Sequence, residues 1–129
     1  MDELIQALIA TGIPFAAYGW SKAPKGDYGV YSLEGSNDLI ASGRHAERVS
    51  RLTVDVFTRA IDVDVIYAPK HKDGYETPPP EQLYSYFSHN PKKEAVEAAL
   101  ERVRCAWFLN SVQFESDTGF VHFEWVVEI

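Results

Sequence analysis

The sequence predicts an α+β domain: a mainly antiparallel sheet of about four or five strands, with an N-terminal helix and one longer helix packed on one face. Residues 52–57 and 121–129 alternate apolar with polar side chains, which is the period of a half-buried strand. Residues 2–11 and 91–103 instead repeat apolar side chains at the spacing of one helical face. The length of 129 residues suits one core, so we expect a single domain over residues 1–129.

The first element expected is a short amphipathic helix. Leu4, Ile5, Leu8 and Ile9 recur at the spacing of one helical face, and Gly12 supplies a C-terminal stop. The N-terminal segment begins with acidic residues and lacks the basic region of a secretory signal. We therefore interpret it as part of the fold.

Two β-favouring segments follow, one on each side of a basic turn that contains Pro24 and Gly26. We expect residues 18–35 to form a hairpin of the core sheet, and Pro14 suits an edge position because it has no N–H for a central ladder. Residues 36–48 are polar and contain glycine. They are expected to form a long hairpin arm or a loop.

A strand is expected next, with Leu52, Val54 and Val56 on the buried side. After it, residues 61–90 include the triplet Pro78-Pro79-Pro80, which suits neither a helix interior nor a central strand. This segment is predicted to be an extended loop excursion from the core.

The longer helix is expected to begin at Asn90, an N-cap residue followed by Pro91 at the first helical position. A C-terminal hairpin should then turn at residues 117–119. Its last strand alternates, and the side chains expected to face the core are Val121, Phe123, Trp125, Val127 and Ile129.

Composition restricts the function classes. Twelve basic residues against nineteen acidic ones give a formal charge of −7, which disfavours sequence-specific binding to the phosphate backbone of nucleic acid. The single cysteine excludes an intramolecular disulfide and a multi-cysteine metal site, and it favours a reducing compartment. Apolar stretches are shorter than the roughly 20 residues of a membrane span.

Motifs for catalysis or cofactor binding are not recognisable in the chain, so we expect no enzyme activity, no cofactor and no metal site. Histidines 45, 71, 89 and 122 are scattered, without the short paired spacings typical of zinc sites. Asp62 and Asp64 lie two apart and are interpreted as the solvated side of a strand. Cys105 is interpreted as a small, buried hydrophobic residue.

Carboxylates crowd the longer helix, at Glu94, Glu97 and Glu101. They could raise one another's pKa, but a solvated helix flank, partly offset by Lys93, is the favoured interpretation. Aromatic residues are also abundant. Those just beyond the proline triplet, at positions 84, 86 and 87, suggest a protein interface.

The order of elements resembles a known family. The stretch "GIPFAAYGWSKAPKGDYGVYSLEGSND" is followed by a charged arm, "RLTVDVFTRA", the acidic helix "KKEAVEAALERV" and a hairpin that ends "FVHFEWVVEI". This arrangement is similar to that of the phage tail-terminator, or tail-completion, proteins of long-tailed phages and prophages. The likeness covers most of the chain except residues 61–90, and it rests on order and texture rather than on a catalytic motif.

The resemblance implies a structural protein of the virion tail, assembled in the host cytoplasm. Subunits of this kind form a homo-oligomeric ring, typically a hexamer, on the head-proximal end of the tail tube. The ring ends tube polymerisation and joins the tail to the head connector, while DNA passes through without sequence-specific binding. The interface residues hypothesised on this basis are Asn37, Asp38, Arg44, His45 and Arg48 in the arm, with Tyr84, Tyr86 and Phe87 beyond the prolines.

Three other interpretations remain open at the level of sequence. One is a neck, head-completion or minor tail protein of the same particle. Another is a small enzyme or a metal- or ligand-binding module unrelated to phages, with Asp55, Asp62, Asp64 and the histidines forming a site. The third is an interaction protein of the toxin and immunity type.

Overall fold

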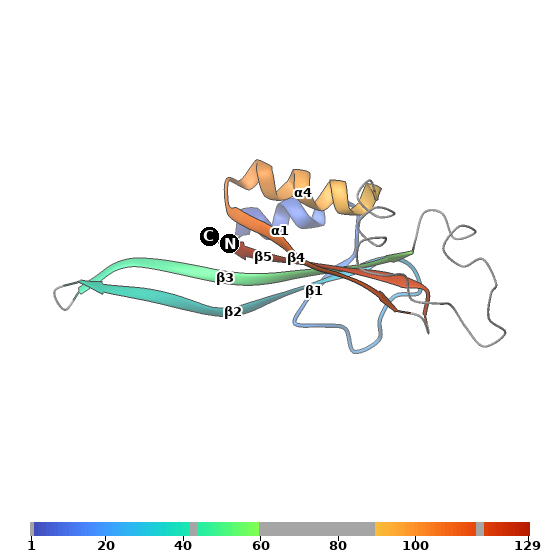
Figure 1. Ribbon diagram of the computed structural model, residues 1–129, viewed down its shortest axis with the longest axis horizontal. Coiled ribbons are helices and arrows are strands. Elements are labelled where there is room, and N and C mark those ends of the chain that lie inside the picture. Colours follow the sequence, from blue (N-terminus) through green and yellow to red (C-terminus); the bar gives the residue numbers. More distant parts are fainter. Residues whose placement is uncertain (1, 42–43, 60–89, 116–117) are drawn as a thin grey trace.

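A computed structural model describes residues 2–41, 44–59, 90–115 and 118–129, and it describes the backbone alone for residues 34–50. It has an α+β fold of two helices and a five-stranded, mostly antiparallel sheet, as the sequence predicts (Figure 1). The elements are α1 (Asp2–Ile9), β1 (Phe15–Ala17), β2 (Tyr28–Ala41), β3 (Arg44–Arg59), α4 (Pro91–Val103), β4 (Ala106–Glu115) and β5 (Phe120–Glu128).

The strands lie in the order β1-β2-β3-β5-β4, and all neighbours are antiparallel except β1 and β2. The expected hairpin over residues 18–35 is therefore wrong. The first strand ends at Ala17, and Tyr18 (φ 63°) and Gly19 (φ 134°) turn the chain out of the sheet. Residues 18–27, with the predicted turn among them, return the chain so that β2 runs parallel to β1.

The parallel pairing of β1 depends on a glycine. Phe15 pairs with Gly29, and a Cβ placed on Gly29 would lie 2.2 Å from the Phe15 ring. The ring therefore occupies the space that any other side chain would need, and it packs against the core from there. Because β1 lies at the edge of the sheet, the position expected for Pro14, just before an edge strand, is confirmed.

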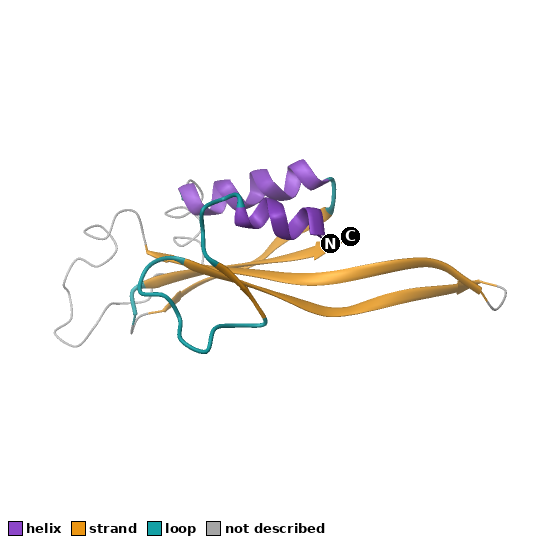
Figure 2. Ribbon diagram, turned by 180° about the vertical axis from the view of Figure 1, so that it is seen from behind, coloured by secondary structure: helices purple, strands orange, loops and turns teal. Residues whose placement is uncertain are grey.

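Both helices cover the same face of the sheet, as Figure 2 shows from behind. Leu4 and Leu8 of α1 are fully buried, but Ile9 is 54% exposed. The buried face of α1 is therefore narrower than the apolar face expected from the sequence. The alternation predicted for β3 and β5 is confirmed. The side chains buried between sheet and helices include Leu52, Val54, Val56, Val121, Phe123, Trp125 and Val127.

Ile129 does not continue this pattern. It follows the last residue of β5, Glu128, and is 40% exposed. Its predicted place in the core is wrong because the alternation of a strand buries side chains only as far as the neighbouring layer extends.

The start of α4 has the predicted structure. Asn90 is buried, and its side-chain oxygen accepts hydrogen bonds from the backbone N–H groups of Lys92 (2.9 Å) and Lys93 (3.3 Å). Val96 and Leu100 are fully buried against the sheet, and Arg104 ends the helix in the left-handed conformation (φ 59°).

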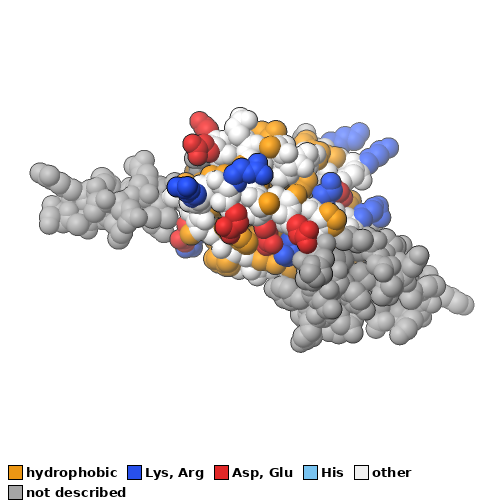
Figure 3. Space-filling view, turned by 90° about the horizontal axis from the view of Figure 1, so that it is seen from above, with side chains coloured by type: hydrophobic (Ala, Val, Ile, Leu, Met, Phe, Trp, Pro, Cys, Tyr) orange, Lys and Arg blue, Asp and Glu red, His pale blue; other side chains and the backbone are white. Residues whose placement is uncertain are grey.

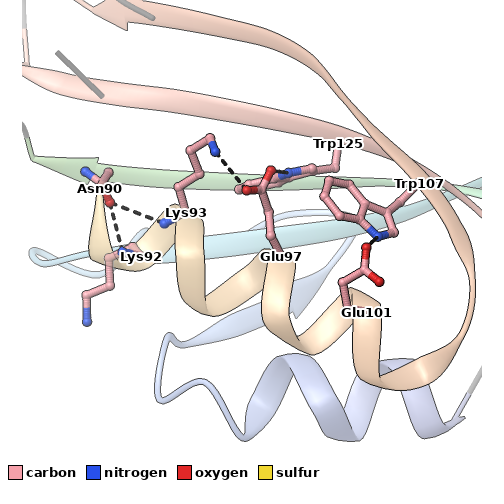
Figure 4. Close-up of polar contacts among 7 residues, drawn as sticks. All are labelled: Asn90, Lys92, Lys93, Glu97, Glu101, Trp107 and Trp125. Carbon is pink, nitrogen blue, oxygen red and sulfur yellow. Dashed lines mark hydrogen bonds and ion pairs between the residues drawn. The ribbon is translucent and has the colours of Figure 1, made fainter. Parts of the chain in front are cut away.

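The carboxylates of α4 are not simply a solvated flank, which corrects the favoured interpretation of the sequence. Trp125 is fully buried, and its indole N–H donates to Glu97 Oε2 at 3.0 Å (Figure 4). Lys93 Nζ binds the other oxygen of Glu97 at 2.8 Å, and the indole of Trp107 donates to Glu101 at 3.0 Å. The acidic side chains therefore attach α4 to β4 and β5.

We predict that Trp125→Ala lowers the free energy of unfolding, measured in urea, by roughly 3–5 kcal/mol, because it empties the centre of the core.

Glu97→Ala should lower the free energy of unfolding by about 1–3 kcal/mol, since it leaves a buried indole N–H without an acceptor. In a Trp125→Phe background, which lacks that N–H, the cost of Glu97→Ala should fall. Urea unfolding of the parent, Glu97→Ala, Trp125→Phe and the double variant measures this, with the exposed Gln6→Ala as control. A cost of Glu97→Ala that is the same in both backgrounds would contradict the role assigned to Glu97.

Asn90→Ala should destabilise the protein by about 1–2 kcal/mol, because two backbone N–H groups of the first turn lose their acceptor. Asn90→Asp keeps the acceptor and should recover most of the loss. Thermal unfolding followed by circular dichroism measures both variants, and equal effects of Ala and Asp would show that the cap contributes little.

Candidate functional site

The longest feature of the molecule is a two-stranded ribbon made by the ends of β2 and β3. The strands pair from Ser36↔Ser50 to Ala41↔Arg44, beyond Arg51, the last residue of β3 that pairs with β5. In Figures 1 and 2 the ribbon projects away from the helices and the rest of the sheet. Six residues of β2, 36–41, lie beyond the sheet and give the ribbon a reach of roughly 20 Å.

The interface residues predicted for the arm all lie at register positions in this ribbon. Asn37 pairs with Val49, and Asp38 pairs with Arg48. Arg44 pairs with Ala41, and His45 pairs with Ile40. The structure thus brings five of the eight predicted site residues onto one projecting element, whereas Tyr84, Tyr86 and Phe87 lie outside the described residues.

The ribbon differs from the body of the sheet in how its backbone is paired. Within the described residues, its two strands pair only with each other, so their outer backbone groups have no partner strand. A two-stranded ribbon is marginally stable in water, and open strand edges promote association with other chains. The backbone geometry therefore favours a ribbon that lies against another surface.

A second surface is the face of the sheet opposite the helices, which we call the open face. It carries an aromatic row: the Tyr28 ring stacks on Phe57 (4.7 Å between centroids), and Phe57 stacks on the His122 imidazole (4.2 Å). Phe120 meets Tyr28 edge-on, and the Arg59 guanidinium lies over Phe120 at 5.2 Å. The row crosses β2, β3 and β5, so it holds these three strands together on the side that the helices do not cover.

Polar groups gather beside this row. Asp55 and Glu124 are directly paired across β3 and β5, and His122 Nε2 lies 2.6 Å from Asp55 Oδ1. The side chains of Asp55 and His122 are each only 16% exposed. Asn110 of β4 donates to Glu124 Oε1 at 2.7 Å. In the described part of the chain, the ligand atoms of Asp55, His122 and Glu124 are grouped closely enough to hold a metal ion.

Only part of this cluster could be predicted from the sequence. Asp55 and the histidines belong to the alternative site hypothesised from the sequence, and the structure brings Asp55 and His122 together. Glu124 was missed, although its spacing of two from His122 on an alternating strand is the signal that places both on one face. Asp62 and Asp64 lie outside the described residues, as do His71 and His89.

Exposed aromatic side chains also lie elsewhere on the domain. Tyr18 is 70% exposed in the loop after β1, and Phe108 is 53% exposed on the edge strand β4. Trp20 in the same loop as Tyr18 is held by a hydrogen bond from its indole to the Gly29 carbonyl (3.0 Å). Exposed aromatic side chains are frequent at protein interfaces.

The helix-bearing side has a mixed surface. Acidic and basic side chains are interspersed with apolar ones there (Figure 3). An open, mostly apolar hollow lies between the helices, lined by residues such as Gln6 and Ala7 of α1 and Val103 of α4. It is separated by the sheet from the cluster of Asp55, His122 and Glu124.

Cys105 has a structural setting. Its Sγ donates to the Leu100 carbonyl at 3.4 Å, and the residue packs against the core while remaining partly accessible. Burial raises the pKa of the Cys105 thiol, with a smaller contribution from the Glu101 carboxylate. A raised pKa lowers the fraction of reactive thiolate, so the geometry favours the interpretation of Cys105 as a packing residue.

Within the described parts of the chain, neither α1 nor α4 has the length and apolar character that crossing a bilayer requires. No family model matches the sequence, and no curated protein is significantly similar to it.

Proposed function

We propose that this protein is a structural subunit of a phage tail that assembles as a ring, typically a hexamer, on the head-proximal end of the tail tube. In this role it stops the addition of tube subunits and forms the joint to the head connector. The observation that carries the proposal is the ribbon of β2 and β3, which projects from the domain with its outer backbone groups unpaired within the described residues.

The ribbon supports assembly for an energetic reason. Bound to a neighbouring subunit or to the tube, its strands gain the packing and backbone partners that the domain itself supplies only near the sheet. A ring requires a heterologous interface, in which one surface of a subunit meets a different surface of the next. The ribbon offers one such surface, and the body of the domain offers others, with exposed aromatic side chains at both edges of the sheet: Tyr18 beside β1 and Phe108 on β4.

The charge of the chain is compatible with a conduit for DNA. A formal charge of −7 gives an average field that repels phosphate, so a channel lined by such subunits would not retain DNA. Net charge does not assign residues to the channel wall. It supports passage of DNA through the ring without sequence-specific binding.

A neck, head-completion or minor tail protein is the second candidate, because the same ribbon would serve a ring at another level of the particle. The binding partner discriminates between the two. A protein that caps purified tail tubes but does not bind connectors fits the terminator proposal, and the opposite preference fits the neck proposal.

We expect the purified protein to form a closed ring of subunits in solution or on tail tubes, since the ribbon is stabilised by a neighbour. Native mass spectrometry gives the number of subunits, and electron microscopy of the protein mixed with tail tubes shows whether the tube end is capped. A subunit that stays monomeric and leaves the tube ends uncovered would contradict the proposal.

A variant without the ribbon tests its role in assembly. It replaces residues 37–49 by Asn-Gly, so that a two-residue turn joins the strands at the pair Ser36↔Ser50. The core should remain folded, with a free energy of unfolding within about 1 kcal/mol of the parent, because shortening a loop changes its closure entropy little. Ring formation and capping should be lost. The exposed α1 variant Gln6→Ala serves as control and should keep both.

The aromatic residues beyond the proline triplet give a separate prediction. If Tyr84, Tyr86 and Phe87 contact a neighbouring subunit, substitution of each by Glu should leave the monomer folded and reduce ring assembly, because a charge would be buried at the interface. Circular dichroism reports folding, and analytical ultracentrifugation reports assembly. Loss of the folded monomer would instead place these residues in the core.

A further inference from the structure

The register of β3 and β5 brings three metal-binding side chain types to one point on the open face. Asp55 pairs directly with Glu124, and His122 lies two residues before Glu124 on the same strand. Alternate residues of a strand share a face, so all three side chains lie on the side away from the helices. One ligand atom from each lies within 4.8 Å of the others.

This arrangement is electrostatically unfavourable without a positive charge. Two carboxylates on directly opposed residues of an antiparallel pair repel each other. Partial burial strengthens the repulsion, because the Asp55 side chain is only 16% exposed and water screens it poorly. A protonated imidazole supplies one positive charge, whereas a divalent cation supplies two and offsets both carboxylates.

The surroundings hold the donors in place. Phe57 stacks on the imidazole of His122 at 4.2 Å with an angle of 18° between the planes, and Tyr28 stacks on Phe57. The Nε2 atom is thereby directed toward Asp55. Asn110 donates to one oxygen of Glu124, which leaves the second carboxylate oxygen to bind elsewhere. Such outer contacts orient ligands in metal sites and raise their affinity.

We propose that Asp55, His122 and Glu124 bind a divalent transition-metal ion of the Zn²⁺ type. Zinc accepts imidazole nitrogen and carboxylate oxygen at about 2.0–2.2 Å, so ligand atoms around one ion lie roughly 3–3.5 Å apart. Binding the ion would replace the 2.6 Å contact between His122 Nε2 and Asp55 Oδ1, and the ligand atoms, which now lie within 4.8 Å of one another, would rearrange around the ion. Mg²⁺ and Ca²⁺ are disfavoured, since they prefer larger sets of oxygen ligands. Three protein ligands leave a further position for water.

The ion would link β3 to β5 on the open face, where the aromatic row already joins the strands. This inference is independent of ring assembly, because all three ligands belong to one subunit. It can therefore be tested on the folded subunit, and its failure would leave the proposed assembly function unchanged.

The test measures the melting temperature of the untagged protein with Zn²⁺, with Mg²⁺ and with a chelator. At about 100-fold excess over Kd, zinc should raise the Tm by roughly 5–10 °C, and Mg²⁺ at the same concentration should not. Asp55→Asn, His122→Gln and Glu124→Gln should each lose most of that shift. Glu128→Gln, which removes a carboxylate from the same strand and face, is the matched control and should retain it.

A second measurement does not depend on variants that fold. Addition of zinc to the ¹⁵N-labelled wild-type protein should move the imidazole nitrogen signals of His122, and bound Co²⁺ should give the visible absorption of a site with nitrogen and oxygen ligands. The proposal is overturned if zinc produces no shift in Tm and leaves the His122 signals unchanged. It is also overturned if the four variants respond equally, because the ion would then bind elsewhere.

Discussion

The burial of Trp125 beneath α4 is the contact on which the rest of the structure depends. Its indole fills the centre of the core, and its N–H finds an acceptor in Glu97, which Lys93 in turn neutralises. This combination lets a large side chain with a polar atom be fully buried without an unsatisfied donor. It also decides which side of the sheet is the core. The alternation of β5 then fixes the direction of its other side chains: Phe123 faces the helices, and His122 and Glu124 face away from them.

The two helices cover one face of the sheet, and both candidate functions arise from what they leave uncovered. On the open face, aromatic rings stack along β2, β3 and β5, and the paired positions of β3 and β5 bring two carboxylates and an imidazole together. Beyond the sheet, β2 and β3 continue without a neighbouring strand in the described chain. The first surface is formed by side chains and suits a small ligand. The second is formed by unpaired backbone and suits another protein.

Local patterns in the sequence predicted the elements well, because each pattern reports a chemical requirement that is met within a few residues. The cap at Asn90 and the alternation of β3 and β5 are examples, and both are confirmed. Partners distant in the chain could not be predicted in the same way. The parallel pairing of β1 depends on Phe15 lying over Gly29, and the exposure of Ile129 depends on where the neighbouring layer ends. The candidate site has the same limit, since Asp55 and Glu124 are 69 residues apart and only the strand register brings them together.

The two surfaces also differ in what they demand of a neighbour. A cation at the open face would be held by one subunit, so it would strengthen the sheet whether or not subunits associate. The ribbon is different, because it lacks a partner strand in the described chain and its own length separates it from the body of the domain. A projecting ribbon and a compact body are unlike surfaces, so contact between them in successive copies is heterologous, and such contacts close into rings when the rotation between subunits permits. The shape of the subunit thus favours a ring or a filament over a symmetric dimer, and a ring is the form that the proposed role at the end of a tail tube requires.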